Sequence, residues 1–210
     1  MRIKVRLRNL SLLVIGSAYS RTGIADICVV RAGDKIFIPG SSLKGVLRTA
    51  AHRISRKMGF TSCGEVEPSR IAEAHRVAGG KCDVCNLFGM SGPPSVASSK
   101  VIVGDMKPMG SVSTFIIGRT SIEPSKGKAK EGSLRTVEVI PTCTIFEGEI
   151  DLLSSDRRDL ILLLGALDEM RYMSFGRGGL VDLMAEIEGA DVSGLDIAKS
   201  LSSWRWNICP

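Results

Sequence analysis

The stretch Ile38-Pro-Gly-Ser-Ser-Leu-Lys-Gly-Val-Leu-Arg48 decides the fold, because a strand ends and a helix begins within it. The β-type run stops at Pro39-Gly40, and Ser41 or Ser42 can cap a helix that we expect over residues 42–58. Apolar residues then recur at helical spacing, which predicts one buried face. The residues of that face are Leu43, Val46, Leu47, Ala50 and Ile54.

Cationic side chains lie along a second face of the same predicted helix. Lys44, Arg48 and His52 are spaced by four residues, so they form a ridge behind the glycine turn. Free N–H groups at a helix N-terminus bind phosphate, and such contacts do not read base sequence. Ser41, Ser42, Lys44 and Arg48 are therefore candidate phosphate-binding residues. The alternative is an ordinary capped helix with its charged side chains in solvent.

The composition favours a globular protein with an acidic partner. The chain has 210 residues, 44% of them hydrophobic, and a net charge of +6. A basic chain favours nucleic acid as its partner. No run of 18 apolar residues exists, and residues 1–8 alternate charged and apolar side chains as a strand does, unlike a signal peptide. We therefore expect a cytoplasmic protein without a membrane partner.

The numbers of amide residues and cysteines indicate the kind of source organism and the redox state of the thiols. Glutamine is absent and there are only three asparagines, which is typical of thermophiles. Six cysteines without a signal peptide predict thiols or metal ligands, with disulfides as the alternative in a hyperthermophile. Cys28, Cys143 and Cys209 are isolated, and we expect Cys143 in the core.

The order of the predicted elements indicates an α+β fold. Residues 60–95 are rich in Gly, Pro and Cys, which is typical of an insertion. Without them the order is β, α, β, β, α, β, the ferredoxin-like order shared with RNA-recognition (RRM-like) modules. Residues 190–210 form a C-terminal extension of what we expect to be one domain, 1–210. Strands are expected over 2–17, 101–106, 110–122, 136–153 and 180–187, and helices over 42–58, 69–78, 156–172 and within the extension.

The insertion carries a Cys/His pattern, Cys63-x11-His75-x6-Cys82-x2-Cys85. A Cys-x2-Cys knuckle places two thiolates on one metal ion, and a third Cys with one His completes a closed tetrahedral site. Such a site has no open position, so the sequence predicts structural zinc. Free or redox-active thiols are the alternative.

A glycine loop, Phe175-Gly-Arg-Gly-Gly179, follows the helix expected over 156–172. Glycines allow the backbone to approach another backbone or a phosphate closely. Arg177 in this loop can bind a phosphate or stack on a base. A tight helix-to-strand turn without a ligand is the alternative.

Pro39-Gly-Ser-Ser-Leu-Lys-Gly-Val-Leu-Arg48 resembles the signature of the RAMP superfamily of CRISPR proteins, which serve antiviral defence. In particular, the chain resembles the backbone subunit of type III (Csm- and Cmr-type) effector complexes, over most of residues 1–187. The resemblance implies a ferredoxin-like fold whose glycine loop, here Gly176, Arg177, Gly178 and Gly179, contacts RNA. Some such subunits also have a Cys/His zinc insertion before a Leu-Phe-Gly segment, here Leu87–Gly89.

Residues 110–140 resemble the thumb hairpin of this family, which presses between nucleotides of the guide–target duplex. The tip contains Lys126, Lys128 and Lys130. The resemblance implies that Arg119 and Arg135 are the charges that face RNA. A solvated hairpin tip is the alternative.

The first loop, residues 18–35, would carry any catalytic group. Its Gly23-Ile-Ala-Asp26-Ile-Cys-Val-Val30 resembles a type III pattern, Gly-Ile-Asp-x-x-Val, whose aspartate is required for cutting target RNA. Asp26 matches that aspartate, and Ala25 and Cys28 depart from the residues usual beside it. A carboxylate in such a loop can hold Mg²⁺ or Mn²⁺ or orient the attacking hydroxyl. Asp26 as a loop cap, and Asp34 in its place, are the alternatives.

Taken together, the resemblance implies a guide-RNA-binding backbone subunit that cuts target RNA and works as an endoribonuclease within a complex. Its partners would be guide RNA, target RNA, other CRISPR effector subunits and further copies of itself in a helical backbone. Arg21 would add a phosphate contact to those named above.

A non-catalytic scaffold subunit and a guide-processing endoribonuclease of the same superfamily remain alternatives. His52 and His75, the only imidazoles, are assigned to a helix face and to zinc, which weakens the processing alternative. A metal-binding protein unrelated to RNA is the remaining possibility.

Overall fold

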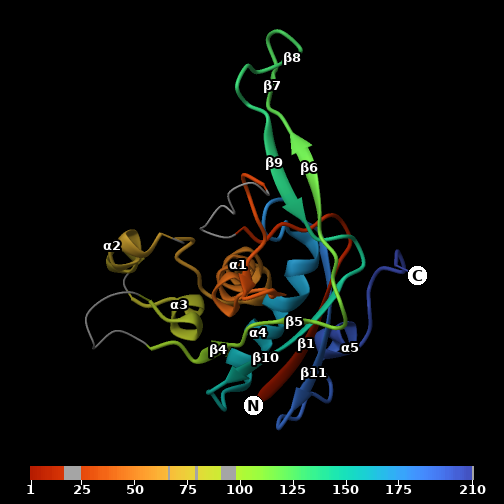
Figure 1. Ribbon diagram of the computed structural model, residues 1–210. Helices are drawn as coiled ribbons and strands as arrows, with labels where there is room; N and C mark the ends of the chain where they lie inside the picture. The colour runs from red at the N-terminus through yellow and green to blue at the C-terminus, as the bar shows by residue number, and fades with distance from the viewer. Residues whose placement is uncertain (17–24, 66, 79, 91–97, 210) are drawn as a thin grey trace.

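Figure 1 shows the computed structural model, which describes residues 1–16, 25–65, 67–78, 80–90 and 98–209. Its centre is one antiparallel sheet in the order β11–β1–β10–β4. The short strand β5 also pairs with β10, as β4 does. Helix α1 lies between β1 and β4 in the chain, and α4 lies between β10 and β11. This is the predicted ferredoxin-like βαββαβ arrangement. The strands of the sheet are β1 (Arg2–Asn9), β4 (Val101–Val103), β5 (Lys107–Pro108), β10 (Ile145–Leu152) and β11 (Val181–Glu188).

Two helices cover one face of the sheet and complete the core. Alternation along β1 buries Ile3, Val5 and Leu7 completely on that face. Helices α1 (Gly40–Ile54) and α4 (Arg157–Glu169) pack there and against each other (Figure 1). The 3-10 turns η1 (Ser55–Met58) and η2 (Met170–Tyr172) extend them. The predicted apolar face of the second helix is confirmed, because its residues are buried in this core: Leu160, Leu163, Leu164, Leu167 and Met170.

Helix α1 begins two residues earlier than predicted, and no side chain of its own caps it. Its N-cap is Pro39, so the expectation of a Ser41 or Ser42 cap is wrong. The N–H of Gly40 instead donates to Oδ1 of Asp105, at 2.7 Å, from the joint between β4 and β5. A Cβ at Gly40 would collide with the carbonyl of Val103, so the helix can start against the sheet only with glycine at this position.

The first strand is shorter than the predicted 2–17. β1 ends at Asn9, whose amide donates to the carbonyls of Ser11 and Pro141, both at 2.8 Å, and fixes a turn there. Residues 13 and 16 then pair only through isolated bridges, Leu13 with Ile140 and Gly16 with Val29.

The expected thumb hairpin is present and projects from the body in Figure 1. Val14, Val137 and Val139 form a small second core at its base. The same side of the molecule carries the short hairpin β2 (Arg31–Ala32) with β3 (Lys35–Ile36). The thumb is formed by β6 (Phe115–Arg119) paired with β9 (Arg135–Val139), and nearer the tip by β7 (Ile122–Glu123) paired with β8 (Lys128–Ala129).

The insertion contains one predicted helix and one that was not predicted. α2 (Pro68–Ala78) agrees with the expected 69–78. α3 (Asp83–Phe88) is a single short helix capped by Cys82, whose sulfur accepts the N–H of Cys85. A six-residue helix with a cysteine cap carries neither the periodicity nor the capping residues from which helices are predicted.

The C-terminal extension contains α5 (Asp196–Leu201) and returns to the sheet. Cys209 forms a disulfide with Cys143, which precedes β10 and is only half-buried. The expectations that Cys143 lies in the core and that these cysteines are isolated are therefore wrong. Across the described ranges, no helix is both long and apolar enough to cross a bilayer.

Candidate nucleic-acid interface and metal centre

The four predicted metal ligands come together in the insertion. Potential ligand atoms of Cys63, His75, Cys82 and Cys85 all lie within 4.8 Å of one another. Helix α3 supplies the knuckle, α2 supplies the histidine, and Cys63 comes from the segment that follows η1. These residues can hold a metal ion such as zinc.

The spacing and chemistry of this cluster fit a tetrahedral metal. A Zn–S distance of about 2.3 Å places two thiolates of a tetrahedron roughly 3.8 Å apart. The sulfurs of Cys63 and Cys85 are 3.7 Å apart. His75 is 94% buried, with 6% of its surface exposed, and neither ring nitrogen has a hydrogen-bond partner among the described residues. A buried imidazole without a partner is costly unless it binds a ligand.

The two knuckle cysteines, Cys82 and Cys85, have pKa values shifted in opposite directions. Hydrogen bonding from the Cys85 side chain lowers the pKa of the Cys82 thiol to about 4. The same bond, together with burial, raises the pKa of Cys85. Metal binding would deprotonate both thiols, because the thiolate is the form that coordinates a metal ion.

The predicted cationic ridge of α1 faces this insertion. Nη2 of Arg48 donates to the sulfur of Cys85 at 3.0 Å, and Nη1 donates to the carbonyl of Gly89 at 3.0 Å. Nζ of Lys44 donates to Ser99 Oγ at 2.7 Å and to the Val101 carbonyl at 2.9 Å, and burial lowers its pKa. Both cations thus have internal partners, and their contact with RNA stays a prediction.

His52, the third member of the ridge, also has an internal partner. Its Nδ1 lies 2.6 Å from Ser62 Oγ at the start of the insertion, and burial lowers the pKa of the imidazole. Arg48 and His52 therefore connect α1 to the metal-ligand segment at two successive turns, and Lys44 connects it to the residues after the insertion.

The start of α1 is largely occupied by protein groups. Asp105 accepts the N–H of Gly40, and the carbonyl of Pro39 accepts those of Ser42 and Leu43 at 3.0 and 3.1 Å. A carboxylate at a helix N-terminus competes with phosphate for the same positive end. Phosphate binding by Ser41 and Ser42 stays a prediction, and Asp105 opposes it.

Asp26 lies at the base of the thumb. Its Oδ2 accepts the N–H and the hydroxyl of Thr136 on β9, at 2.7 and 2.9 Å. These hydrogen bonds, that of the backbone N–H above all, lower the pKa of Asp26. The side chain is nevertheless exposed, so an ionised carboxylate faces solvent beside the thumb.

The glycine loop packs near the same segment. The N–H of Arg177 donates to the carbonyl of Val14 at 3.1 Å. A Cβ placed on Gly16 would lie 3.2 Å from Arg177 Nε and 3.8 Å from the side chain of Ile27, the residue after Asp26. Arg177 and the Asp26 segment therefore flank one point, Gly16, close to the base of the thumb.

Two arginines face each other across the thumb. Arg119 and Arg135 are directly paired in the register of β6 and β9, and both are exposed. In the part of the chain that the structure describes, neither has a carboxylate within ion-pair distance. Like charges placed opposite each other destabilise a hairpin unless a polyanion neutralises them.

The predicted site residues thus form two groups rather than one. Asp26, Arg177 and the base of the thumb lie together. Arg48 instead contacts the metal ligand Cys85, and Lys44 binds Ser99 and Val101. Arg21 lies outside the described residues.

Sequence reasoning missed the charge pattern of the open sheet face. Cations on β1 pair with acids on both neighbouring strands: Arg2 with Asp151 at 3.0 Å, Lys4 with Glu188 at 2.6 Å and Arg6 with Glu147 at 2.7 Å. The alternating charges of β1 were the available signal. RNA-recognition modules stack bases on aromatic residues of this face. Here the cations Arg2, Lys4 and Arg6 are paired with acids of the neighbouring strands, so they present little free positive charge to RNA.

Comparison with known families identifies the fold group. The family model of the RAMP superfamily matches residues 6–179. The chain belongs to the RAMP superfamily. No curated protein matches the sequence. Membership supports a CRISPR-associated, RNA-binding role with RNA and CRISPR proteins as partners. The matched region of this RAMP protein includes the thumb, Asp26 and the glycine loop, and ends before the C-terminal extension.

Proposed function

We propose that this RAMP protein is a guide-RNA-binding backbone subunit of a type III CRISPR effector complex. Guide pairing would read the target, and the protein would hold RNA through phosphates and stacking, as in another RNA-guided system. The observation that carries the proposal is the unneutralised pair Arg119 and Arg135 on a projecting hairpin. An RNA backbone beside the thumb would supply the missing negative charge.

Other features of the thumb support an interface there. Its exposed apolar side chains would be unfavourable on an isolated two-stranded hairpin, which is itself marginally stable in water. They include Phe115, Ile116, Ile122 and Leu134, between 44% and 75% exposed. Insertion between nucleotides would bury such side chains.

Salt dependence of RNA binding tests this interface. Each phosphate contact on a single strand contributes about 0.7 to the slope of log affinity against log salt. We expect Arg119→Ala and Arg135→Ala each to lower that slope by about this amount. Each variant should also lower the affinity for RNAs of unrelated sequence by the same factor. Arg2→Ala, which removes a cation already paired with Asp151, is the matched control and should change neither. An unchanged slope in both thumb variants would refute RNA contact by these arginines.

We further propose that Asp26 takes part in cutting target RNA. Its carboxylate is exposed, ionised and next to the glycine loop and thumb. The Cys/His cluster is the only group of three or more potential metal ligands among the described residues. A Mg²⁺ or Mn²⁺ ion at Asp26 would therefore take its other ligands from RNA phosphates and water, as Mg²⁺ commonly does.

The test uses the subunit assembled with guide RNA and its protein partners. We expect Asp26→Asn to bind target RNA normally and to lose cleavage, with Asp34→Asn as the matched control that still cuts. Asparagine retains an oxygen that can accept the Thr136 hydrogen bonds, so it separates charge from the structural role of Asp26. If the Asp26→Asn complex cut RNA at the wild-type rate, the protein would be a scaffold subunit. This is the second candidate function, and the Thr136 hydrogen bonds favour it because they give Asp26 a structural role.

We also propose that the Cys/His cluster binds structural zinc. All four positions of a tetrahedron are taken by protein ligands, which leaves no place for a substrate. The zinc would hold α2 and α3 together beside α1. His75 lies in the cluster, and the Nε2 of His52, which has no hydrogen-bond partner among the described residues, is buried, so neither imidazole is well placed to act as a base for guide processing.

A further inference from the structure

We propose that Tyr172, Arg205 and Trp206 form a stacking site for one unpaired base of single-stranded RNA. The proposal rests on the RNA binding proposed above and adds a contact that the superfamily match does not include. Arg205 and Trp206 lie beyond residue 179, where that match ends. Tyr172 ends η2, and two residues separate it from Phe175, where the glycine loop begins.

The three side chains form a compact aromatic and cationic surface. The rings of Tyr172 and Trp206 pack edge to face, with centroids 5.7 Å apart. The guanidinium of Arg205 lies 5.6 Å from the centroid of Tyr172 and 5.4 Å from that of Trp206. Tyr172 is 47% exposed and Arg205 is exposed. Aromatic rings next to an arginine plane are the combination on which proteins stack unpaired bases.

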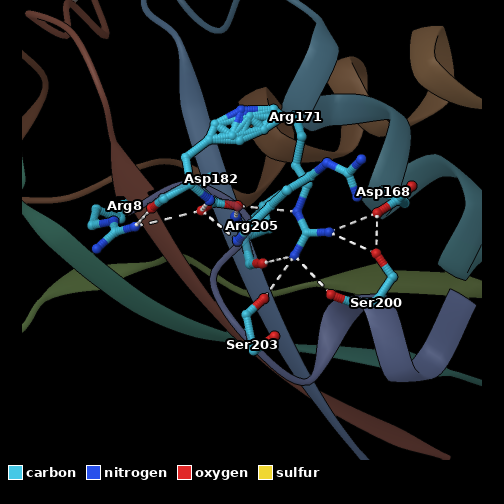
Figure 2. Close-up of polar contacts among 9 residues, drawn as sticks. Arg8, Asp168, Arg171, Asp182, Ser200, Ser203 and Arg205 are labelled. Carbon is cyan, nitrogen blue, oxygen red and sulfur yellow. Dashed lines mark hydrogen bonds and ion pairs between the residues drawn. The ribbon is translucent and has the colours of Figure 1, made fainter. Parts of the chain in front are cut away.

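A buried ion pair fixes the backbone beneath this surface (Figure 2). Oδ2 of Asp182 accepts the N–H groups of Arg205 and Trp206 at 2.8 and 3.0 Å. Asp182 also pairs with Arg171 at 3.0 Å, and both side chains are fully buried. Arg171 in turn donates to the carbonyls of Ser200 and Ser203 at 3.1 and 3.0 Å.

This network positions the tail. A buried ion pair adds little stability relative to apolar residues of the same size, because desolvation offsets the attraction. The pair in Figure 2 does anchor the tail, because its two side chains bind the backbone of Ser200, Ser203, Arg205 and Trp206. A stacking site needs such a rigid support, because a mobile ring loses entropy when it binds.

Charge and size favour a base over a protein partner. Within the described residues, Arg205 has no carboxylate at ion-pair distance, so its charge is available to a phosphate or a base. Three partly exposed side chains offer at most about 300 Å². A stable protein interface takes about 800 Å² from each partner, whereas one base needs only a ring face.

Tryptophan emission reports on this site directly, because the chain has only two tryptophans, Trp204 and Trp206. Trp204→Phe leaves Trp206 as the single emitter and keeps a ring against Arg8. The full-length variant is titrated with an unstructured single-stranded RNA while the anisotropy of labelled RNA measures binding in parallel. We expect Trp206 emission to be quenched in proportion to the bound fraction. In the matched variant Trp206→Phe, the emission of Trp204 should not change.

A second measurement gives the energetic effect. Trp206→Ala should lower RNA affinity about 5- to 150-fold, the range for one base on an aromatic ring. RNA binding by anisotropy with unchanged Trp206 emission would overturn the stacking site and leave the proposed function intact. Absence of RNA binding altogether would overturn both. A blue shift of Trp206 emission with protein concentration alone would show a protein contact and also overturn the site.

Discussion

Arg48 joins helix α1 to the metal-ligand cluster through one guanidinium. It donates to the sulfur of Cys85, within α3, and to the carbonyl of Gly89, the C-cap of that helix. An N–H bond to a thiolate ligand orients the sulfur and lowers its negative charge, which tunes the metal it binds. Residues in this position typically change metal affinity by about 10- to 100-fold.

We therefore expect Arg48→Ala to hold zinc about 10- to 100-fold more weakly, measured by competition with a coloured chelator. The wild type should contain about one zinc per chain by elemental analysis. Arg48→Lys, which keeps the charge and cannot make both contacts, should fall between the two. If Arg48→Ala retained wild-type zinc affinity and lost RNA affinity instead, the residue would be a phosphate ligand and not part of the metal centre.

Helical spacing could predict the face on which Arg48 lies but not what packs against it. Lys44, Arg48 and His52 do share one face, as predicted. Their partners Ser99, Cys85 and Ser62 belong to the insertion and the residues after it, 10 to 55 positions later. Periodicity describes a single element, and sequence alone does not say which other segment covers it.

At the scale of elements, the conformation of the glycine loop requires glycine at one position more strictly than at the others. Gly176 has φ of 61°, and a Cβ there would collide with the carbonyl of Val14. Gly178 has φ of 86° with open space around it. A non-glycine residue in the left-handed region costs about 1–3 kcal/mol, and only Gly176 adds a backbone collision to that strain.

We expect Gly176→Ala to reduce the free energy of unfolding by clearly more than Gly178→Ala, which should lose only about 1 kcal/mol. Urea denaturation followed by circular dichroism measures both. Gly176→Ala should also weaken RNA binding, because the loop that carries Arg177 must move away from Val14. Equal losses for the two variants would show that the loop shifts without cost and is not held against residues 13–16.

The elements were predictable where they followed common patterns. The helices at 42–58, 69–78 and 156–172 and the thumb rest on periodicity or resemblance, and the structure contains all of them. The cap of α1 was not predictable, because Asp105 lies 65 residues beyond Gly40 in the sequence. The end of β1 at Asn9 was missed because the apolar run that follows, residues 12–15, is itself typical of a strand although the backbone turns before it.

At the scale of the molecule, the sequence could predict the ferredoxin-like order of strands and helices. It could not predict which residues hold the C-terminal tail against the sheet. The order follows from counting strands and helices. The tail is held by Asp182, Arg171 and Arg8, whose charges look like those of any exposed strand or helix end. The Cys143–Cys209 disulfide likewise joins positions 66 residues apart with no motif between them. Long-range polar pairing of this kind carries no local signal.

The buried pair should matter to the whole fold, since it connects η2, β11 and the tail (Figure 2). Asp182→Asn removes the fully buried one of the two carboxylates that pair with Arg171 and leaves only Asp168, which is partly exposed. Removal of one partner of a buried pair costs about 3–5 kcal/mol. The matched control is Asp151→Asn on the same sheet, which breaks an exposed pair with Arg2 and should cost no more than about 1 kcal/mol.

Two probes distinguish a loss of the tail from a loss of global stability. Circular dichroism in urea follows the sheet and helices, and tryptophan emission follows the tail, where both tryptophans lie. For Asp182→Asn we expect both transitions to move together to lower urea, because Arg171 is buried between α4 and the sheet as well as under the tail. If only the emission changed, the pair would hold the tail alone, and the sheet would be stable without it.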